Sequence, residues 1–271
     1  MKHLLVHLCN SSKPQWLIES AIELATLARA RLRGYTIVDT RHFLEKAGME
    51  SSGYAGVEAT RLALAERRQT ESRETFVSQC IRREVPCDVR DQRGDPLELL
   101  ADEAKYHDLT ILSCGGKRNI PELGLSPQDL IELAQRVVQP LLILRHEPAS
   151  LNRVLLVYDG SSAASRAIRS FLSNAFFLGR EFRLVCVGEA ADPQGGAYRE
   201  MTQYCQSRIA AMETGLLPGS PLKTVTRYAQ KWEADLLVLG ISRSANWWGK
   251  PYGQLASDVL QQTELPIYAF A

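Results

Sequence analysis

The sequence predicts an α/β protein in which two tandem domains each contain an open, five-stranded parallel sheet. Short unbroken apolar runs, such as residues 236–239, alternate with segments whose apolar residues recur at helical spacing. Such runs are typical of strands buried on both faces, as in a parallel sheet covered by helices. After a polar linker at residues 146–150 the same order of elements begins again, and 271 residues accommodate two domains.

The first domain is predicted to span residues 1–146. Its strands are expected at residues 3–8, 35–38, 87–90, 109–112 and 141–144, and its helices at residues 16–33, 57–83, 94–107 and 128–138. Gly34 is interpreted as the residue that ends the first helix, because glycine commonly follows a helix C-terminus.

The second domain is predicted to span residues 151–271. Its strands are expected at residues 154–158, 182–187, 236–239 and 267–270, and its helices at residues 165–178, at 198–212, from 221 onward and after 253. Gly179 is interpreted as the stop of the first of these helices.

The two halves carry matching strand sequences, which indicates an internal duplication. DLTIL at Asp108 matches DLLVL at Asp235, and PLLIL at Pro140 matches PIYAF at Pro266. The repeat is too long for a solenoid unit, so it predicts two globular domains.

Composition and charge favour a cytoplasmic protein and exclude several classes of function. The formal net charge is +1 with no basic stripe, so nucleic-acid binding is not expected. No apolar run approaches the roughly 18 residues that a membrane span requires. The six cysteines form no CxxC pair, which favours free thiols in a reducing cytoplasm over zinc or disulfides; they are Cys9, Cys80, Cys87, Cys114, Cys186 and Cys205.

One loop near the C-terminus has the features of a phosphate-binding site. The strand at residues 236–239 ends at Gly240, an irregular loop follows, and Gly253 precedes a helix. A helix N-terminus offers backbone N–H groups and a positive dipole to an anion. The sequence contains no GxSxG or HExxH motif and no nucleophile with a recognisable base, so no catalytic residue and no metal site are predicted.

These segments resemble the universal stress protein family in its tandem two-domain form. The resemblance is strongest in VLLVYDGSSAASRAI, which starts the second half, and in DLLVLG, GQLASDVL and LPIYAF near its end. It implies a flavodoxin-like sandwich of the adenine nucleotide alpha hydrolase-like type. Nucleotide-binding members of the family carry an Asp after the first strand and a loop written G, two residues, G, nine residues, G, then Ser or Thr.

Carried over to this chain, the resemblance assigns five candidate nucleotide-binding residues. Asp159 occupies the Asp position, Gly240 and Gly253 the first and third glycines, Arg243 the second glycine and Gln254 the Ser or Thr position. Arg243 brings a long side chain into the phosphate space, yet a guanidinium is also a good phosphate partner. The implied ligand is ATP or a related adenine nucleotide, and the competing interpretation is that the two glycines serve only the turn and the helix start.

The first half departs further from the family pattern. Leu8 stands where Asp159 stands in the second half, Ser113 replaces the first glycine, Gly116 keeps the second, and Ser126 falls near the third. We therefore expect the first half to serve as a structural partner of the second.

Two further features have alternative interpretations. Trp247 and Trp248 could cover a ligand or a partner, or they could simply bury area. Asp159 could instead be the N-cap of the helix that follows it.

The sequence leaves three hypotheses of function. The chain is a stress-response module that binds nucleotide, a weak ATPase, or a nucleotide-free interaction protein. The resemblance also implies that residues 141–144 and 267–270 pair antiparallel within one chain, and it leaves a homodimer possible.

Overall fold

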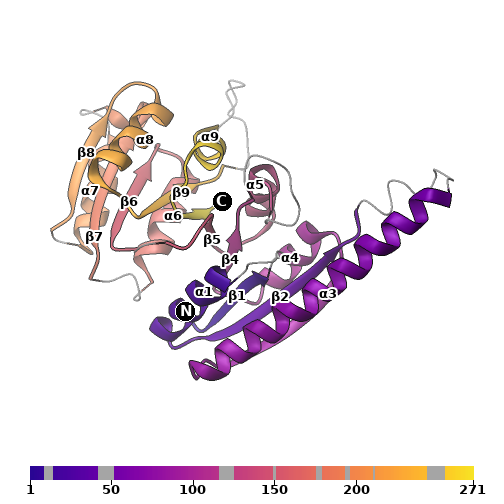
Figure 1. Cartoon of the computed structure of the whole chain (residues 1–271). Coiled ribbons are helices and arrows are strands. Elements are labelled where there is room, and N and C mark those ends of the chain that lie inside the picture. The colour runs from indigo at the N-terminus through magenta and orange to yellow at the C-terminus, as the bar shows by residue number, and fades with distance from the viewer. Residues whose placement is uncertain are drawn as a thin grey trace. The chain divides into compact units, whose positions relative to one another are not determined.

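The computed structural model describes residues 1–8, 15–41, 52–115, 125–148, 151–174, 179–192, 196–209, 211–242 and 254–271. These residues form two compact units, Met1–Asp129 and Leu130–Ala271 (Figure 1). The domain boundary proposed at residues 146 and 151 follows the sequence repeat and stays a prediction, whereas the compact units follow contacts in space.

The first unit contains four parallel strands covered by helices. The strand order is β3-β2-β1-β4. The strands are β1 (His3–Leu8), β2 (Arg31–Asp39), β3 (Cys87–Gly94) and β4 (Leu109–Ser113). The helices are α1 (Gln15–Ala28), α3 (Ser52–Arg82) and α4 (Pro96–Ala104), and α5 (Pro127–Arg136) begins in this unit and ends in the next. The central strand β1 pairs with β2 on one side and with β4 on the other.

The second unit repeats this arrangement and adds strands at one side. Its strand order is β5-β10-β9-β6-β7-β8. The strands are β5 (Leu141–Leu144), β6 (Arg153–Tyr158), β7 (Glu181–Val187), β8 (Glu213–Leu217), β9 (Leu236–Gly240) and β10 (Ile267–Phe270). The helices are α6 (Ser162–Leu172), α7 (Gly196–Gln206), α8 (Pro221–Trp232) and α9 (Gln254–Gln262), with a 3₁₀ turn, η3 (Gly188–Ala191).

The same strand order and one repeated polar contact are consistent with a duplication. In both units the third, second, first and fourth strands of the repeat lie side by side in that order. The Asp108 carboxylate accepts hydrogen bonds from the backbone N–H groups of Lys2 and His3, at 3.0 Å for His3. The Asp235 carboxylate accepts the equivalent bonds from Asn152 at 3.0 Å and from Arg153 at 2.9 Å. This contact gives a physical reason for the matching DLTIL and DLLVL sequences.

The predicted antiparallel pairing of residues 141–144 with 267–270 is confirmed. Tyr268 lies opposite Leu142, with Ile267 opposite Ile143. The Tyr268 ring is fully buried and packs edge-on against Phe171, with the ring centroids 5.0 Å apart. Its hydroxyl shares a 2.8 Å hydrogen bond with Ser170, so its polar end is satisfied.

The predicted role of Gly34 as a helix stop is wrong. Helix α1 ends at Ala28 and β2 already begins at Arg31, so Gly34 lies inside a strand. A Cβ atom at this position would lie 2.9 Å from both the Leu8 and Phe76 side chains. Gly34 therefore provides space for core packing.

Two predictions in the second half also need correction. Helix α6 ends at Leu172 with Ser173 as its C-cap, so Gly179 does not end it. The predicted helix at residues 198–212 ends at Gln206, and the strand β8 (Glu213–Leu217), which the pattern did not assign, follows. The four residues after Glu213 are all half-buried, so the strand lacks the alternation or continuous apolar run by which strands are recognised.

In the part of the chain that the structure describes, no helix combines the length and apolar character needed to cross a membrane.

We predict that His7 makes the stability of the chain sensitive to pH. His7 is 7% exposed, and burial lowers its pKa to about 4. An unfolded imidazole titrates near pH 6.5, so between these values the unfolded chain binds more protons and stability falls as pH decreases. At pH 5 the loss relative to pH 7.5 should be about 2 kcal/mol from this group.

Urea unfolding of the wild type and a His7→Leu variant at both pH values measures this effect. The variant should lose about 2 kcal/mol less than the wild type, whereas His146→Gln, which changes an exposed imidazole, should retain the wild-type difference. Equal losses in H7L and the wild type would contradict the prediction.

Candidate functional site

Asp159 lies directly after the central strand β6 of the second unit and is partly exposed. Its Oδ1 accepts a 2.9 Å hydrogen bond from the backbone N–H of Ser161. Gly160 between them has a φ of +84°, which glycine adopts without strain. The turn therefore fixes the direction of the carboxylate at the end of the strand.

The interpretation of Asp159 as the N-cap of the following helix is wrong. The N-cap of α6 is Ser161, whose Oγ accepts a 3.0 Å hydrogen bond from the Ala164 N–H. Asp159 lies two residues earlier and binds the N–H of the cap itself. Because another residue caps the helix, the Asp159 carboxylate is not needed for that purpose.

Gly240 ends strand β9, and its environment explains why it is glycine. A Cβ atom here would lie 2.1 Å from the backbone N of Ala164 and 2.4 Å from the carbonyl C of Ala163. Helix α6 therefore approaches the end of β9 so closely that only glycine fits. This is a packing reason for Gly240, and it holds whether or not a ligand binds.

Asp159 and Gly240 lie at the same end of neighbouring strands. Strands β6 and β9 pair in parallel, with Leu156 opposite Val238. Two residues later in each strand, Tyr158 is therefore opposite Gly240. The following residue, Ile241, is buried, and its N–H donates a 2.8 Å hydrogen bond to the Phe270 carbonyl. The structure thus brings two of the five predicted residues together at the carboxyl ends of two neighbouring strands.

The other predicted residues lie wholly or partly outside the described part of the chain. Arg243 and Gly253 fall outside it, as do Trp247, Trp248 and Gly116. Gln254 is the first residue of α9, but its side chain is not among those described.

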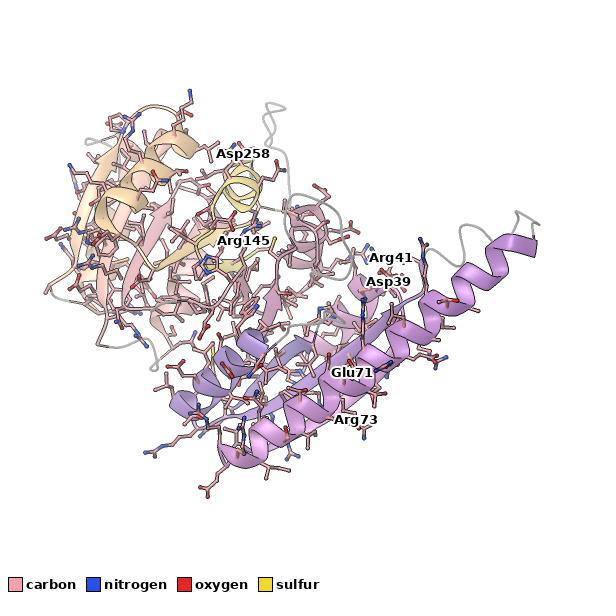
Figure 2. The ribbon with its side chains drawn as sticks, viewed as in Figure 1. Asp39, Arg41, Glu71, Arg73, Arg145 and Asp258 are labelled. Atoms are coloured by element: carbon pink, nitrogen blue, oxygen red, sulfur yellow. The ribbon has the colours of Figure 1, made fainter. Side chains whose placement is uncertain are left out.

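In the first unit, polar contacts occupy the corresponding end of the sheet. Ser126 and Asp129 form reciprocal hydrogen bonds at the start of α5, from Ser126 Oγ to Asp129 Oδ2 at 2.8 Å and from the Asp129 N–H to Ser126 Oγ at 3.1 Å. The Arg41 guanidinium lies near Asp39 (Figure 2) and pairs with it at 2.7 Å. It also pairs with Asp129 at 3.4 Å. The hydrogen bond with Asp39 raises the pKa of Arg41, so this guanidinium is ionised at any physiological pH.

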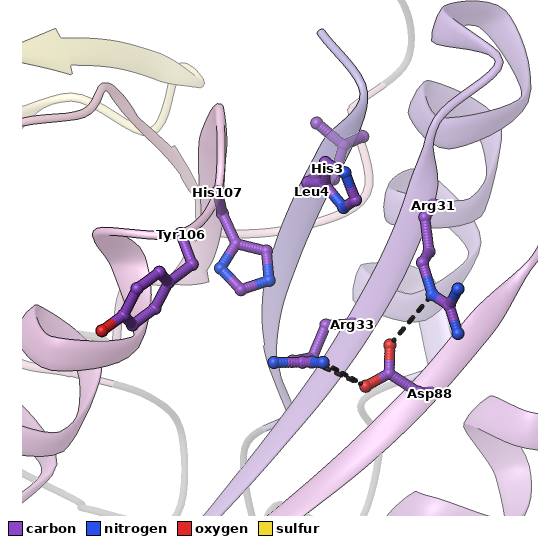
Figure 3. Close-up of a pocket in the computed structure, with 7 residues that line it drawn as sticks. All are labelled: His3, Leu4, Arg31, Arg33, Asp88, Tyr106 and His107. Carbon is purple, nitrogen blue, oxygen red and sulfur yellow. Dashed lines mark hydrogen bonds and ion pairs between the residues drawn. The ribbon is translucent and has the colours of Figure 1, made fainter.

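A separate pocket lies at the opposite, amino-terminal ends of the strands in the first unit. It has a volume of about 460 Å³, and two arginines, two histidines and an aspartate are among its lining residues (Figure 3). No sequence pattern reveals this pocket, because His3, Arg31 and His107 are far apart in the chain. Among the described residues, no group of three or more His, Cys, Asp or Glu side chains could hold a metal ion.

Comparison with known proteins finds sequence and fold similarity to universal stress proteins. No protein-family model matches the chain. A universal stress protein from Synechocystis sp. is 22% identical over 184 residues, which cover 67% of this chain and 64% of that relative. The match thus spans less than two thirds of the relative's length.

Solved structures extend the similarity to the whole chain. A universal stress protein from Archaeoglobus fulgidus DSM 4304 matches with a TM-score of 0.68 and 16% identity, covering 99% of this chain and 95% of that one. A candidate universal stress protein from Pseudomonas aeruginosa UCBPP-PA14 matches with a TM-score of 0.65 and 15% identity, covering 100% and 93%. The predicted α/β fold and the resemblance to tandem universal stress proteins are confirmed.

We predict that Gly240→Ala destabilises the second unit. Its Cβ would have to displace the backbone of α6, and overpacking of this kind costs about 1–3 kcal/mol or more. The matched control is Gly215→Ala, because a Cβ at Gly215 has no atom within 4 Å. Urea unfolding should show a loss for G240A and a change within about 0.5 kcal/mol for G215A. Equal stability of the two variants would refute the close approach of helix and strand.

Proposed function

We propose that this chain, similar in sequence and fold to universal stress proteins, is a stress-response regulatory module that binds an adenine nucleotide such as ATP. The proposed site is the crevice beside Asp159 and Gly240 at the carboxyl ends of the strands in the second unit. The geometry of this site in the chain itself supports the proposal.

The strand order supports this location. In the order β10-β9-β6-β7-β8 the chain connections reverse direction between β6 and β9. Ligands of open parallel sheets bind in the crevice outside the carboxyl ends of the strands at such a switch point. Asp159 follows one of these two strands and Gly240 ends the other.

The Asp159 carboxylate carries the proposal. Its Oδ1 is used by the Ser161 N–H, and among the described residues its Oδ2 has no hydrogen-bond partner. A fixed carboxylate with one available oxygen is suited to accept a hydrogen bond from a ribose hydroxyl. Arg243, Gly253 and Gln254 would then contribute to the phosphate side, next to the N-terminus of α9.

A nucleotide-free interaction module is the second candidate, and two observations favour it. Gly240 is required by packing alone, and the Ala164 N–H at the start of α6 is already bonded to Ser161. The first observation explains the glycine without a ligand, and the second leaves the Ala164 N–H with a partner other than a phosphate. The proposal also includes a cytoplasmic location, because the five cysteines in the described part of the chain form no disulfide, and it is compatible with a homodimer.

We predict that Asp159→Asn weakens nucleotide binding about tenfold or more. Hydrogen bonds to charged groups contribute about 1.5–3 kcal/mol, and a tenfold change corresponds to about 1.4 kcal/mol. Isothermal titration of the full chain with ATP, preceded by native mass spectrometry of the purified protein, measures the affinity and detects any co-purified nucleotide.

The control is Glu181→Gln, which removes the same charge at the amino-terminal end of the neighbouring strand β7. It should bind ATP as the wild type does. Absence of ATP binding by the wild type would reject the proposal in favour of the interaction module, and sustained phosphate release from ATP would favour the weak ATPase.

A further inference from the structure

The pocket of the first unit lies at the amino-terminal ends of β1 and β2, beside the turn that precedes β4. Its walls include His3, Arg31 and Arg33 from the strands and His107 from the turn (Figure 3). The pocket lies in the first unit at the amino ends of its strands, whereas the proposed nucleotide site lies in the second unit at the carboxyl ends of its own strands. The pocket is therefore a separate feature, and a ligand could bind in it whether or not the second unit binds nucleotide.

One wall of the pocket is held rigid by a network of ion pairs. Arg33 binds Asp88 Oδ2 at 2.6 Å through Nη2 and Glu103 Oε1 at 2.7 Å through Nη1. The Glu103 side chain is only 2% exposed, and its second oxygen accepts a 2.8 Å bond from Arg90. The hydrogen bonds with Glu103 and Asp88 raise the pKa of Arg33. A buried carboxylate with two guanidinium partners is fully compensated, so Arg33 is fixed in place.

Arg31 has hydrogen-bonding capacity that this network does not use. Its ion pair with Asp88 is a long one, from Nε to Oδ1 at 3.4 Å, and its side chain is 56% exposed. Among the described residues, neither of its Nη groups has a partner. Two adjacent N–H donors on a guanidinium match the two oxygens of a carboxylate.

His107 presents an acceptor to the same pocket. The residue is 6% exposed, and its Nδ1 lies 2.9 Å from the Glu103 carbonyl oxygen. A carbonyl can only accept, so Nδ1 carries the hydrogen and Nε2 of the neutral ring is an acceptor. Burial lowers the pKa of His107, which favours this neutral form. Nε2 has no partner within the described residues, so it is available to a ligand hydroxyl.

The charges around the pocket match a monoanion. Three guanidinium groups, those of Arg31, Arg33 and Arg90, pair with two carboxylates, those of Asp88 and Glu103. This cluster of ion pairs therefore has one positive charge in excess. Tyr106 also lines the pocket and is 74% exposed. Its aromatic ring therefore offers a surface to an apolar part of a ligand.

We propose that this pocket binds a small hydroxycarboxylate with an apolar substituent. The carboxylate pairs with the Nη groups of Arg31, the hydroxyl donates to His107 Nε2, and the substituent lies against Tyr106. A volume of about 460 Å³ accommodates a molecule of this size.

Titration of the full chain with 3-phenyllactate tests the proposal, with the histidine ring signals followed by ¹H–¹³C NMR. We expect saturable shifts of the His107 signals. Three matched compounds each lack one group: 3-phenylpropionate has no hydroxyl, 1-phenyl-2-propanol has no carboxylate, and lactate has no ring. Each should bind at least about fivefold more weakly, because each loses one of the three contacts.

Variants assign the contacts. Arg31→Gln should weaken 3-phenyllactate about tenfold or more, whereas the control Arg67→Gln, which changes an exposed arginine of α3, should not alter it. His107→Phe should abolish the preference for 3-phenyllactate over 3-phenylpropionate while leaving binding of the latter, provided that the far-UV circular dichroism is unchanged. If His107→Phe does not fold, the preference is measured in Arg31→Gln, where both acids should bind more weakly and 3-phenyllactate should still bind better than 3-phenylpropionate, because the contact of its hydroxyl with His107 is kept.

Three results would overturn the proposal. The first is the absence of saturable shifts at His107 in the wild type. The second is equal binding by R31Q and R67Q. The third is equal affinity of the wild type for 3-phenyllactate and 3-phenylpropionate. Each is independent of the ATP titration, because that experiment reports on the second unit.

Discussion

Burial of a central strand on both faces and along both edges is the constraint on which the rest of this structure depends. Strand β1 bonds to β2 and β4, and β6 bonds to β7 and β9, so neither has a free edge. Residues 4–6 and 154–156 are fully buried. Polar chemistry is therefore confined to the strand ends, where Asp159 lies at a carboxyl end and His3 at an amino end.

The amino ends of these strands are fixed by a carboxylate in each unit. Asp108 and Asp235 each accept two backbone N–H groups from the residues that begin or precede the central strand. Burial disfavours the charged form of Asp108, but the two hydrogen bonds outweigh it, and its pKa lies below the usual value. An ionised carboxylate thus fixes the fourth strand against the first, and the register of the switch point at the other end depends on that alignment.

Strands whose apolar residues reflect their own burial can be predicted from the sequence. Features that depend on contacts with residues distant in the chain cannot. The runs at β1, β4, β6 and β9 are largely apolar, so their strands could be assigned directly. The role of Gly34 could not be predicted, because the side chains of Leu8 and Phe76 pack against it and leave no room for a Cβ atom. No local sequence pattern reveals these contacts.

The candidate site shows the same division. The resemblance to universal stress proteins points to Asp159 and Gly240, but the sequence does not show that their roles differ. Gly240 has a packing role, whereas Asp159 has an oxygen without a partner among the described residues. The pocket of the first unit could not be predicted, because it joins residues from segments that only the folded sheet brings together.

The two units differ in how the polar groups at the carboxyl ends of their strands are satisfied. In the first unit Arg41 is held between Asp39 and Asp129, and the start of α5 is closed by Ser126. A guanidinium that is bound to two carboxylates has little left to offer a phosphate, and both carboxylates would repel one. In the second unit Asp159, at the end of the central strand, makes a single hydrogen bond among the described residues, and α6 has its own serine cap. The first unit satisfies these polar groups internally, whereas the second retains one that is fixed in place and not fully used, which is the condition for binding a ligand with little reorganisation.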